Sequence, residues 1–177
     1  KSKIALDIGA SLGTYSYLML QHSKKVIAIE PLKEKCQKLD YLFRNLENFE
    51  VLNIAVSDKI DEKQIRVPLG DTGRSTIENS NNLLDVKTKI DKRLVKTKTI
   101  DSLSLKNIGF IKIDVEGHEE SVILGGLKTI KEQRPSLLIE IEERHKKGSI
   151  ESMVDILRSI NYSCFFYAGD KIREFGE

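Results

Sequence analysis

Two short runs near the start of the chain combine glycine with acidic side chains in a way that suits a nucleotide-like ligand. The first contains Asp7, Gly9, Ala10 and Gly13 and directly follows an apolar run. Glycine is needed where the backbone turns sharply or approaches a ligand closely, and amide groups at a helix N-terminus point into the same space. We expect these four residues to form a cofactor-binding loop between a strand and a helix.

The spacing of this first run favours a cation over a phosphate. It reads Asp-x-Gly-x-x-x-Gly, whereas dinucleotide sites read Gly-x-Gly-x-x-Gly. Asp7 at the end of a strand would repel a phosphate at close range. S-adenosylmethionine suits it, because its methionine end carries an ammonium and a sulfonium beside a carboxylate that backbone amides can hold. Taken alone, the run has a simpler interpretation, in which Asp7 caps a loop and the glycines only make a turn.

The second run is Glu30 and Pro31, at the end of another apolar segment and about twenty residues beyond the first glycine. An acid at the end of the second strand of a βαβ unit is placed to accept hydrogen bonds from both ribose hydroxyls. Pro31 cannot donate to a strand ladder, so it suits the point where the strand stops. We therefore predict Glu30 as the ribose ligand.

More polar residues follow later apolar runs. Ser57 and Asp58 follow residues 49–56, and Asp58 is a candidate acceptor for an adenine amino group, with a plain turn residue as the alternative. Asp114 follows residues 109–113, and ligands bind at the carboxyl ends of such strands. We predict Ser57, Asp58 and Asp114 as further cofactor-binding residues.

His118 and His145 are the candidate general bases, because both follow strands at the expected catalytic edge and histidine titrates near neutral pH. Asp114 is the alternative base. Asp114, Glu116 and Glu140 together offer carboxylates for a magnesium ion, but metal-ligand spacing is missing, and we expect no metal.

The elements that must position these residues alternate regularly. The expected strands are residues 4–8, 26–30, 49–56, 109–113 and 136–143; the expected helices are 15–21, 33–46, 121–131 and 149–160, the last with Ser149 as N-cap; and a closing hairpin spans 162–167 and 171–175. This order predicts a Rossmann-like, doubly wound α/β fold with a mostly parallel sheet of about seven strands and an antiparallel C-terminal hairpin.

Residues 60–99 break the α/β alternation. Two short strands, 64–67 and 94–100, flank a polar middle, which predicts a hairpin and loop insertion that contributes to a substrate site. The stretch from Val86 to Lys98 is rich in lysine and carries a single acid, Asp91. A solvated face is the preferred interpretation of this basic cluster, with an acidic substrate or surface as the alternative.

Composition sets wider bounds. A chain of 177 residues with 40% hydrophobic residues suits one domain over 1–177, and a net charge of +2 gives no overall field for nucleic acid or membrane. We find no membrane-spanning run and no signal-like segment before the first strand. Cys36 and Cys164 lie far apart without metal-binding spacing, which indicates a reducing compartment and a cytoplasmic protein.

Taken together, several motifs resemble the FkbM family of class I S-adenosylmethionine-dependent methyltransferases. The resemblance covers Lys3 to about Glu142 and rests on the two runs above, on Asn53 to Asp58, on Thr99 to Leu103, and above all on Ile111-Lys112-Ile113-Asp114-Val115-Glu116-Gly117-His118-Glu119. It implies O-methylation of a sugar or natural-product hydroxyl, with a small-molecule or glycan acceptor.

Three alternatives stay open. A non-catalytic module that binds the cofactor or supports a partner has the same sequence features. A nicotinamide-dependent reductase is disfavoured by Asp7 and the glycine spacing. Methylation of nucleobase amino groups is disfavoured because Asp-Val-Glu-Gly stands where an Asn/Asp-Pro-Pro-aromatic loop is expected, and the basic cluster lacks aromatic stacking residues, so we expect no nucleic-acid partner.

Overall fold

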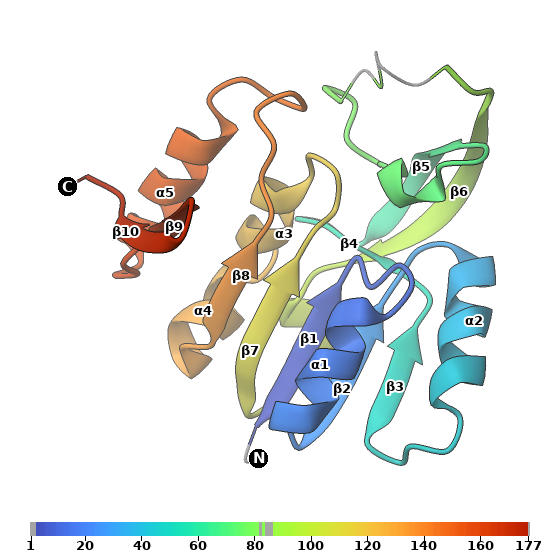
Figure 1. Cartoon of the computed structure of the whole chain (residues 1–177), viewed down its shortest axis with the longest axis horizontal. Helices are drawn as coiled ribbons and strands as arrows, with labels where there is room; N and C mark the ends of the chain where they lie inside the picture. The colour runs from blue at the N-terminus through green and yellow to red at the C-terminus, as the bar shows by residue number, and fades with distance from the viewer. Residues whose placement is uncertain (1–2, 82, 84–86, 177) are drawn as a thin grey trace.

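A parallel five-stranded sheet forms the centre of the molecule. The computed structural model describes residues 3–81, 83 and 87–176. The strand order is β3-β2-β1-β7-β8, and each neighbouring pair is parallel (Figure 1). The strands are β1 (Ile4–Ile8), β2 (Lys25–Ile29), β3 (Phe49–Leu52), β7 (Ile108–Ile113) and β8 (Ser136–Ile139). Because all five run the same way, their carboxyl ends meet at one edge, where ligands bind in folds of this type.

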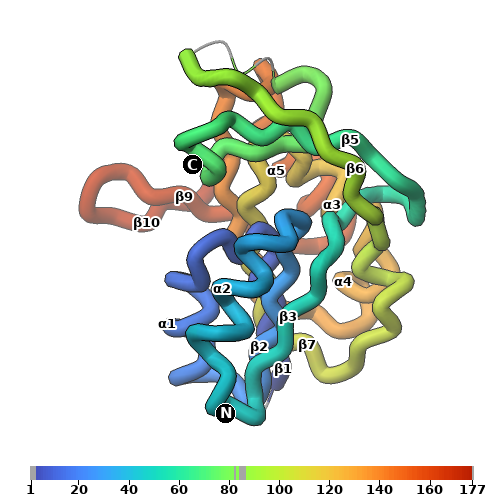
Figure 2. Tube along the Cα trace, turned by 90° about the vertical axis from the view of Figure 1, so that its right-hand side faces the viewer, coloured from blue at the N-terminus to red at the C-terminus, as the bar shows by residue number. Residues whose placement is uncertain are grey.

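Helices cover both faces of this sheet (Figure 2). One face carries α1 (Thr14–His22) and α2 (Lys33–Phe43), and the other carries α3 (Glu119–Leu124), α4 (Leu127–Gln133) and α5 (Ser149–Ser159). Side chains alternate along each strand, so in β1 Ala5 packs toward α1 while Leu6 and Ile8 pack toward α3 and α5. Both faces are therefore buried, which explains why these strands read as continuous apolar runs.

Two smaller sheets lie beside the central one (Figure 1). β5 (Asp61–Pro68) and β6 (Ile90–Lys98) form an antiparallel hairpin, and β4 (Ala55–Val56) pairs parallel with β6. Short 3-10 helices follow β5 at Thr72–Arg74 and β6 at Asp101–Leu103. The hairpin of β9 (Phe165–Ala168) and β10 (Lys171–Glu174) is a separate two-stranded sheet on the side of the molecule away from β5 and β6.

The predicted fold class is confirmed, with a different division of strands. The central sheet holds five strands where about seven were expected, because β9 and β10 pair only with each other among the described strands. Residues 49–56, predicted as one strand, form the two strands β3 and β4. The Asn53 side chain separates them: its Nδ2 donates to the carbonyl oxygens of Glu30 (3.0 Å) and Pro31 (2.9 Å). The chain thereby leaves the central sheet after β3 and joins the insertion as β4.

The start of α5 differs from the prediction. Gly148, with φ 78°, is the N-cap, and Ser149 is the first helical residue without a side-chain cap bond. The capping oxygens come from Glu143, whose carboxylate accepts from the amides of Gly148 (2.9 Å) and Ile150 (3.1 Å). An anionic cap also suits the positive end of the helix dipole, so Glu143 replaces the serine predicted there.

The insertion is a hairpin, as predicted, and the lysines of β6 lie on the exposed side of that strand. Lys92, Lys96 and Lys98 alternate with more buried residues, while Arg93 pairs with Asp91 and Glu34. Val86, where the predicted basic cluster begins, lies outside the described residues. This arrangement favours the solvated-face interpretation; the single domain over 1–177 stays a prediction.

Two sequence-based expectations concern the whole chain. Within the described residues, no helix has the length and apolarity required to cross a bilayer. Cys36 and Cys164 are both buried free thiols. The reducing compartment and cytoplasmic location inferred from these cysteines stay predictions.

Close packing at Gly125 joins α3 to the loop after β4. Gly125 and Gly126 interrupt the helix predicted over 121–131 and divide it into α3 and α4. A Cβ on Gly125 would lie 2.1 Å from the carbonyl oxygen of Ser57, although φ of Gly125 is an ordinary −72°. Glycine is therefore required at position 125 because the Ser57 backbone leaves no room for a side chain, and not because of its backbone dihedral angles.

We expect Gly125→Ala to destabilise the protein by about 1–3 kcal/mol or more, because a methyl group must displace the backbone at Ser57. Gly73→Ala is the matched control, since its nearest contact would be 3.7 Å away and φ is not positive; we expect a change within about 0.5 kcal/mol. Urea unfolding measures both variants. Equal effects would contradict the packing argument.

Candidate functional site

A cavity of about 280 Å³ lies at the carboxyl ends of the central strands. Its walls come from the first loop, the end of β2, β4, the insertion and the loop after β7; the lining residues are Ile8, Gly9, Ser11, Ile29, Glu30, Pro31, Lys35, Ile54, Ala55, Val56, Gly73, Arg74, Ser75, Ile77, Asp114, Val115 and Glu116. The volume is close to the lower end, roughly 300 Å³, of typical ligand pockets. Predicted residues Gly9, Glu30, Pro31 and Asp114 all contribute to these walls.

The glycines of the first loop permit close approach of neighbouring segments, by backbone at Gly9 and by side chains at Gly13. A Cβ on Gly9 would lie 1.8 Å from the carbonyl oxygen of Asp114, and one on Gly13 would lie 2.6 Å from Leu39. Both residues have positive φ, 75° and 83°. The amides of Gly9 and Ala10 donate to the carbonyl of Ile29, and neither Ala10 nor Gly13 is part of the cavity wall. These glycines therefore shape the loop against β2, α2 and the loop after β7.

Asp7 lies beneath the cavity and is fully buried. Its Oδ2 accepts from Ser16 Oγ of α1 at 2.6 Å, and its Oδ1 lies 3.5 Å from Lys112 Nζ on the neighbouring strand. The same ammonium donates to the Gly9 carbonyl at 2.9 Å and lies 3.4 Å from Asp114 Oδ2. The cation expected beside Asp7 is thus supplied by the protein, and direct cofactor binding by Asp7 stays a prediction.

Glu30 lies in the cavity wall just beyond β2, and its role as the ribose ligand stays a prediction. Its two carboxylate oxygens accept one backbone amide each, from Ser11 and Leu32, both at 3.0 Å. A carboxylate offers about four lone-pair positions, so two remain for hydroxyl groups in the cavity. Burial raises the pKa of Glu30, and the nearby Lys35 opposes this. Lys35 also donates to Ser11 Oγ (3.1 Å) and to the carbonyl of Thr72 (2.8 Å), which ties the first loop to the insertion.

Ser57, Asp58 and His118 form a network beside the cavity and not in its wall. Ser57 Oγ lies 2.9 Å from His118 Nε2, donates to Asp58 Oδ1 at 2.9 Å, and accepts from Lys63 Nζ at 3.0 Å. His118 Nδ1 lies 2.9 Å from Glu78 Oε2 of the insertion. This contact with His118 lowers the pKa of Glu78 to about 2. Ser57 and His118 are buried, so this network anchors the insertion to the sheet.

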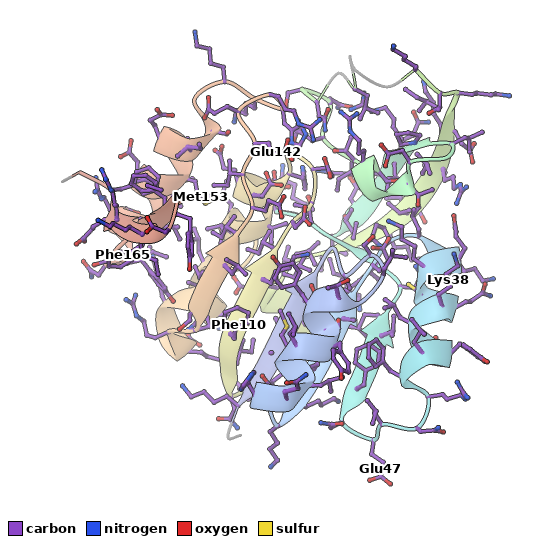
Figure 3. The ribbon with its side chains drawn as sticks, in the orientation of Figure 1. Lys38, Glu47, Phe110, Glu142, Met153 and Phe165 are labelled. Carbon is purple, nitrogen blue, oxygen red and sulfur yellow. The ribbon has the colours of Figure 1, made fainter. Side chains whose placement is uncertain are left out.

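Asp114, Glu116 and His145 come together at the rim formed after β7 and β8. Glu116 Oε2 and His145 Nε2 are 3.2 Å apart, and His145 is buried. Burial, followed by the negative charges of Asp114 and Glu142, raises the pKa of Glu116 to about 7. Burial, followed by Arg144, lowers the pKa of His145. Glu142 follows β8 at the same end of the molecule (Figure 3).

The alternative magnesium site does not assemble from the described side chains. In residues 3–81, 83 and 87–176, no group of three or more histidine, cysteine, aspartate or glutamate side chains is arranged to hold a metal ion. Glu140 lies just beyond β8, and the negative charge of Asp114, followed by burial, raises its pKa. Asp114 itself already faces the Lys112 ammonium.

Several site residues were missed by the sequence reasoning. Lys112 is the main one, and its signal was present: a lysine in an apolar strand, on the same face as Asp7 of the adjacent strand, implies a buried partner. Lys35 and Glu78 gave no comparable signal, because one belongs to an ordinary amphipathic helix and the other to a polar loop. Their roles depend on how the insertion folds back over the strand ends.

The sheet, its two helix layers and the cavity at the strand ends define the α/β methyltransferase-like fold. The chain belongs to the Methyltransferase FkbM domain family, whose sequence pattern matches residues 7–164. The predicted family is therefore confirmed. No curated protein sequence matches the chain significantly.

Two of the solved structures that resemble this chain illustrate the shared fold. The methyltransferase FkbM from Methylobacillus flagellatus KT superimposes with a TM-score of 0.63 at 22% identity, over 90% of this chain and 37% of that one. The present chain thus spans little more than a third of that protein. A putative methyltransferase from Streptococcus mutans, solved in complex with SAH, gives a TM-score of 0.52 at 11% identity, over 99% and 90% of the two chains.

The Glu78 contact predicts a pH-dependent stability. Because the pKa of Glu78 is about 2 in the folded protein and ordinarily 4.5, its contribution is complete above pH 4.5 and is lost as the pH falls toward 2. We expect Glu78→Gln to reduce the stability lost between pH 6 and pH 3 by on the order of 2 kcal/mol relative to the wild type.

Urea unfolding at both pH values tests this expectation. The exposed Glu47, at the lower end of the molecule in Figure 3, provides the matched control, and Glu47→Gln should follow the wild type. If Glu78→Gln loses as much stability as the wild type over this interval, the ion pair with His118 does not form.

Proposed function

We propose that the chain is an S-adenosylmethionine-dependent methyltransferase that O-methylates a hydroxyl group of a sugar or another small-molecule or glycan acceptor. The observation that carries this is Glu30, a buried carboxylate in the cavity wall with acceptor positions left for two ribose hydroxyls. Family membership supports methyl transfer. The Streptococcus mutans neighbour, solved with SAH, supports a cofactor of this type.

The residues around the cavity fit the parts of this cofactor. Glu30 would hold the ribose, and the apolar side chains of Ile54, Val56 and Ile77 would enclose a flat adenine ring. The backbone at Gly9 and the carboxylate of Asp114 lie on the side where the methionine end would be held. When bound, S-adenosylmethionine supplies a methyl group on a positively charged sulfur, which is an excellent leaving group. The remaining tasks of the protein are alignment and proton removal, and good alignment alone supplies several kcal/mol.

The insertion would form the acceptor side of the cavity. Gly73, Arg74 and Ser75 line it together with Asp114 and Glu116. A wall with two carboxylates disfavours an acidic acceptor, while hydroxyl groups can donate to carboxylates and accept from cationic side chains. A neutral polyol such as a sugar therefore matches this mixture, and residues 60–99 would contribute to the choice of acceptor.

We expect S-adenosylmethionine to bind in calorimetric titration and Glu30→Gln to weaken binding by about 1.5–3 kcal/mol, because hydrogen bonds to a charged acceptor are lost. Glu50→Gln is the matched control; Glu50 lies on β3, pairs with Lys25, and is outside the cavity wall. Titration with NADH tests the reductase alternative. NADH binding, or S-adenosylmethionine binding that is insensitive to Glu30, would contradict the proposed cofactor site.

We expect neutral sugars and glycans to be methylated in preference to uronic acids or RNA. Release of S-adenosylhomocysteine, followed with each acceptor at fixed ionic strength, measures this preference. Tight cofactor binding without turnover of any acceptor would favour the non-catalytic module. Turnover of RNA, with the strong salt dependence typical of phosphate contacts, would overturn the assignment of the acceptor.

A further inference from the structure

Three carboxylate side chains line the cavity in the described part of the chain, and they differ in what faces them. Glu30 accepts two backbone amides, and Asp114 lies 3.4 Å from the Lys112 ammonium. Both carboxylates are thus already engaged by amide groups or by a cation of the protein. Glu116 instead faces the imidazole of His145 at 3.2 Å. Its environment is the one that favours accepting a proton.

The backbone of Glu116 is held in an unusual conformation by the insertion. Its φ is 54°, in the left-handed region, and Gly117 follows with φ 100°. The carbonyl oxygen of Glu116 accepts from Thr76 Oγ1 at 2.8 Å and from Asn81 Nδ2 at 2.9 Å. Non-glycine residues stay in this region only where surrounding contacts enforce it, and such positions cluster at functional sites. The insertion therefore fixes the backbone from which the Glu116 side chain extends.

The facing atoms of Glu116 and His145 are buried, and His145 Nε2 also lies 3.9 Å from Glu142 Oε2. Glu116 Oε2 and His145 Nε2 are both buried, and neither makes a hydrogen bond within the described residues. The His145 side chain is only 5% exposed and approaches Gly117 so closely that a Cβ there would lie 3.0 Å from it. The imidazole is thus fixed in place behind the carboxylate, while the carboxylate reaches the cavity.

We propose that Glu116 is the catalytic residue that accepts the proton of the acceptor hydroxyl, and that His145 is a positioning residue that orients the Glu116 carboxylate. This proposal rests on the methyl transfer proposed above. The O–H bond of the acceptor breaks and its proton moves to a Glu116 carboxylate oxygen. The freed electron pair forms the new bond from oxygen to the methyl carbon, and the electrons of the broken S–CH3 bond stay on sulfur.

The other predicted bases are less well placed. Both ring nitrogens of His118 already have partners, Ser57 and Glu78, and His118 is outside the cavity wall. His145 is also outside the wall and reaches it only through Glu116. Asp114 is paired with an ammonium.

The charge state of Glu116 sets a pH dependence. The groups that face it are Asp114, Glu142, Arg144, Arg74 and His145, and burial together with the two acids brings its pKa to about 7. Since the ionised carboxylate is the base, turnover should rise with pH through about 7 and fall below it. An ordinary glutamate would remain ionised and active down to about pH 4.5.

Carbon-13 NMR of glutamate carboxyl groups in the cofactor-free protein tests the proposal without turnover. The resonance lost in Glu116→Gln identifies Glu116, and we expect its titration midpoint near pH 7. His145→Ala should lower this midpoint by about one pH unit, because burial is the main cause of the raised pKa of Glu116 and loss of the imidazole lets water reach the carboxylate, and His145→Gln should restore it in part. A midpoint near 4.5, or one that His145→Ala leaves unchanged, would overturn the assignment.

Kinetics and cofactor binding complete the test. With the acceptor from the panel above, Glu116→Gln should lower kcat by about 100- to 10,000-fold while the affinity for S-adenosylmethionine is retained. Glu120→Gln is the control; Glu120 pairs with Lys146 outside the cavity wall. Unchanged kcat in Glu116→Gln would remove Glu116 from the reaction but leave the proposed function intact. Failure of the wild type to bind S-adenosylmethionine would overturn the proposed function, whereas the NMR titration would still decide the state of Glu116.

Discussion

The buried ammonium of Lys112 is the interaction on which the geometry of the site depends. It lies between Asp7 and Asp114, the acids of two adjacent strands, and donates to the Gly9 carbonyl. A buried charge of either sign is costly alone, so each of these groups fixes the others in place. The close approach of Gly9 to the Asp114 carbonyl belongs to the same junction. Two loops that carry cavity residues are thereby held together by one side chain that lies beneath the cavity.

The sequence was informative wherever local pattern and long-range packing agree. Apolar runs ending in Asp7, Glu30 and Asp114 predicted the strands and the edge where ligands bind, because strands buried on both faces admit few polar residues before their ends. The same reasoning predicted a strand over residues 49–56, whereas β3 ends at Leu52. Ala55 and Val56 are apolar enough for the central sheet, but the Asn53 side chain redirects the chain, and such a bond to distant carbonyl groups leaves no pattern in the sequence.

The roles of the two histidines were beyond sequence reasoning for a related reason. His118 and His145 both follow strands at the predicted edge, yet one anchors the insertion through Glu78 and the other lies behind Glu116. Which of these occurs is decided by the insertion, whose residues Thr76 and Asn81 also fix the Glu116 backbone. The central sheet and its helices therefore determine where the site lies. The insertion determines which contacts the titratable groups of the site make.

Lys35 connects the first loop to the insertion, and this connection affects how the two segments bind a ligand. Its ammonium connects Ser11 in the first loop with Thr72 in the insertion, and it lies beside Glu30. A ligand that orders one of these segments thus acts on the other through a shared buried charge. Linkage requires the effect on affinity to be equal in both directions. The two halves of the cavity are in this sense a single cooperative unit, in which occupancy of one side prepares the other.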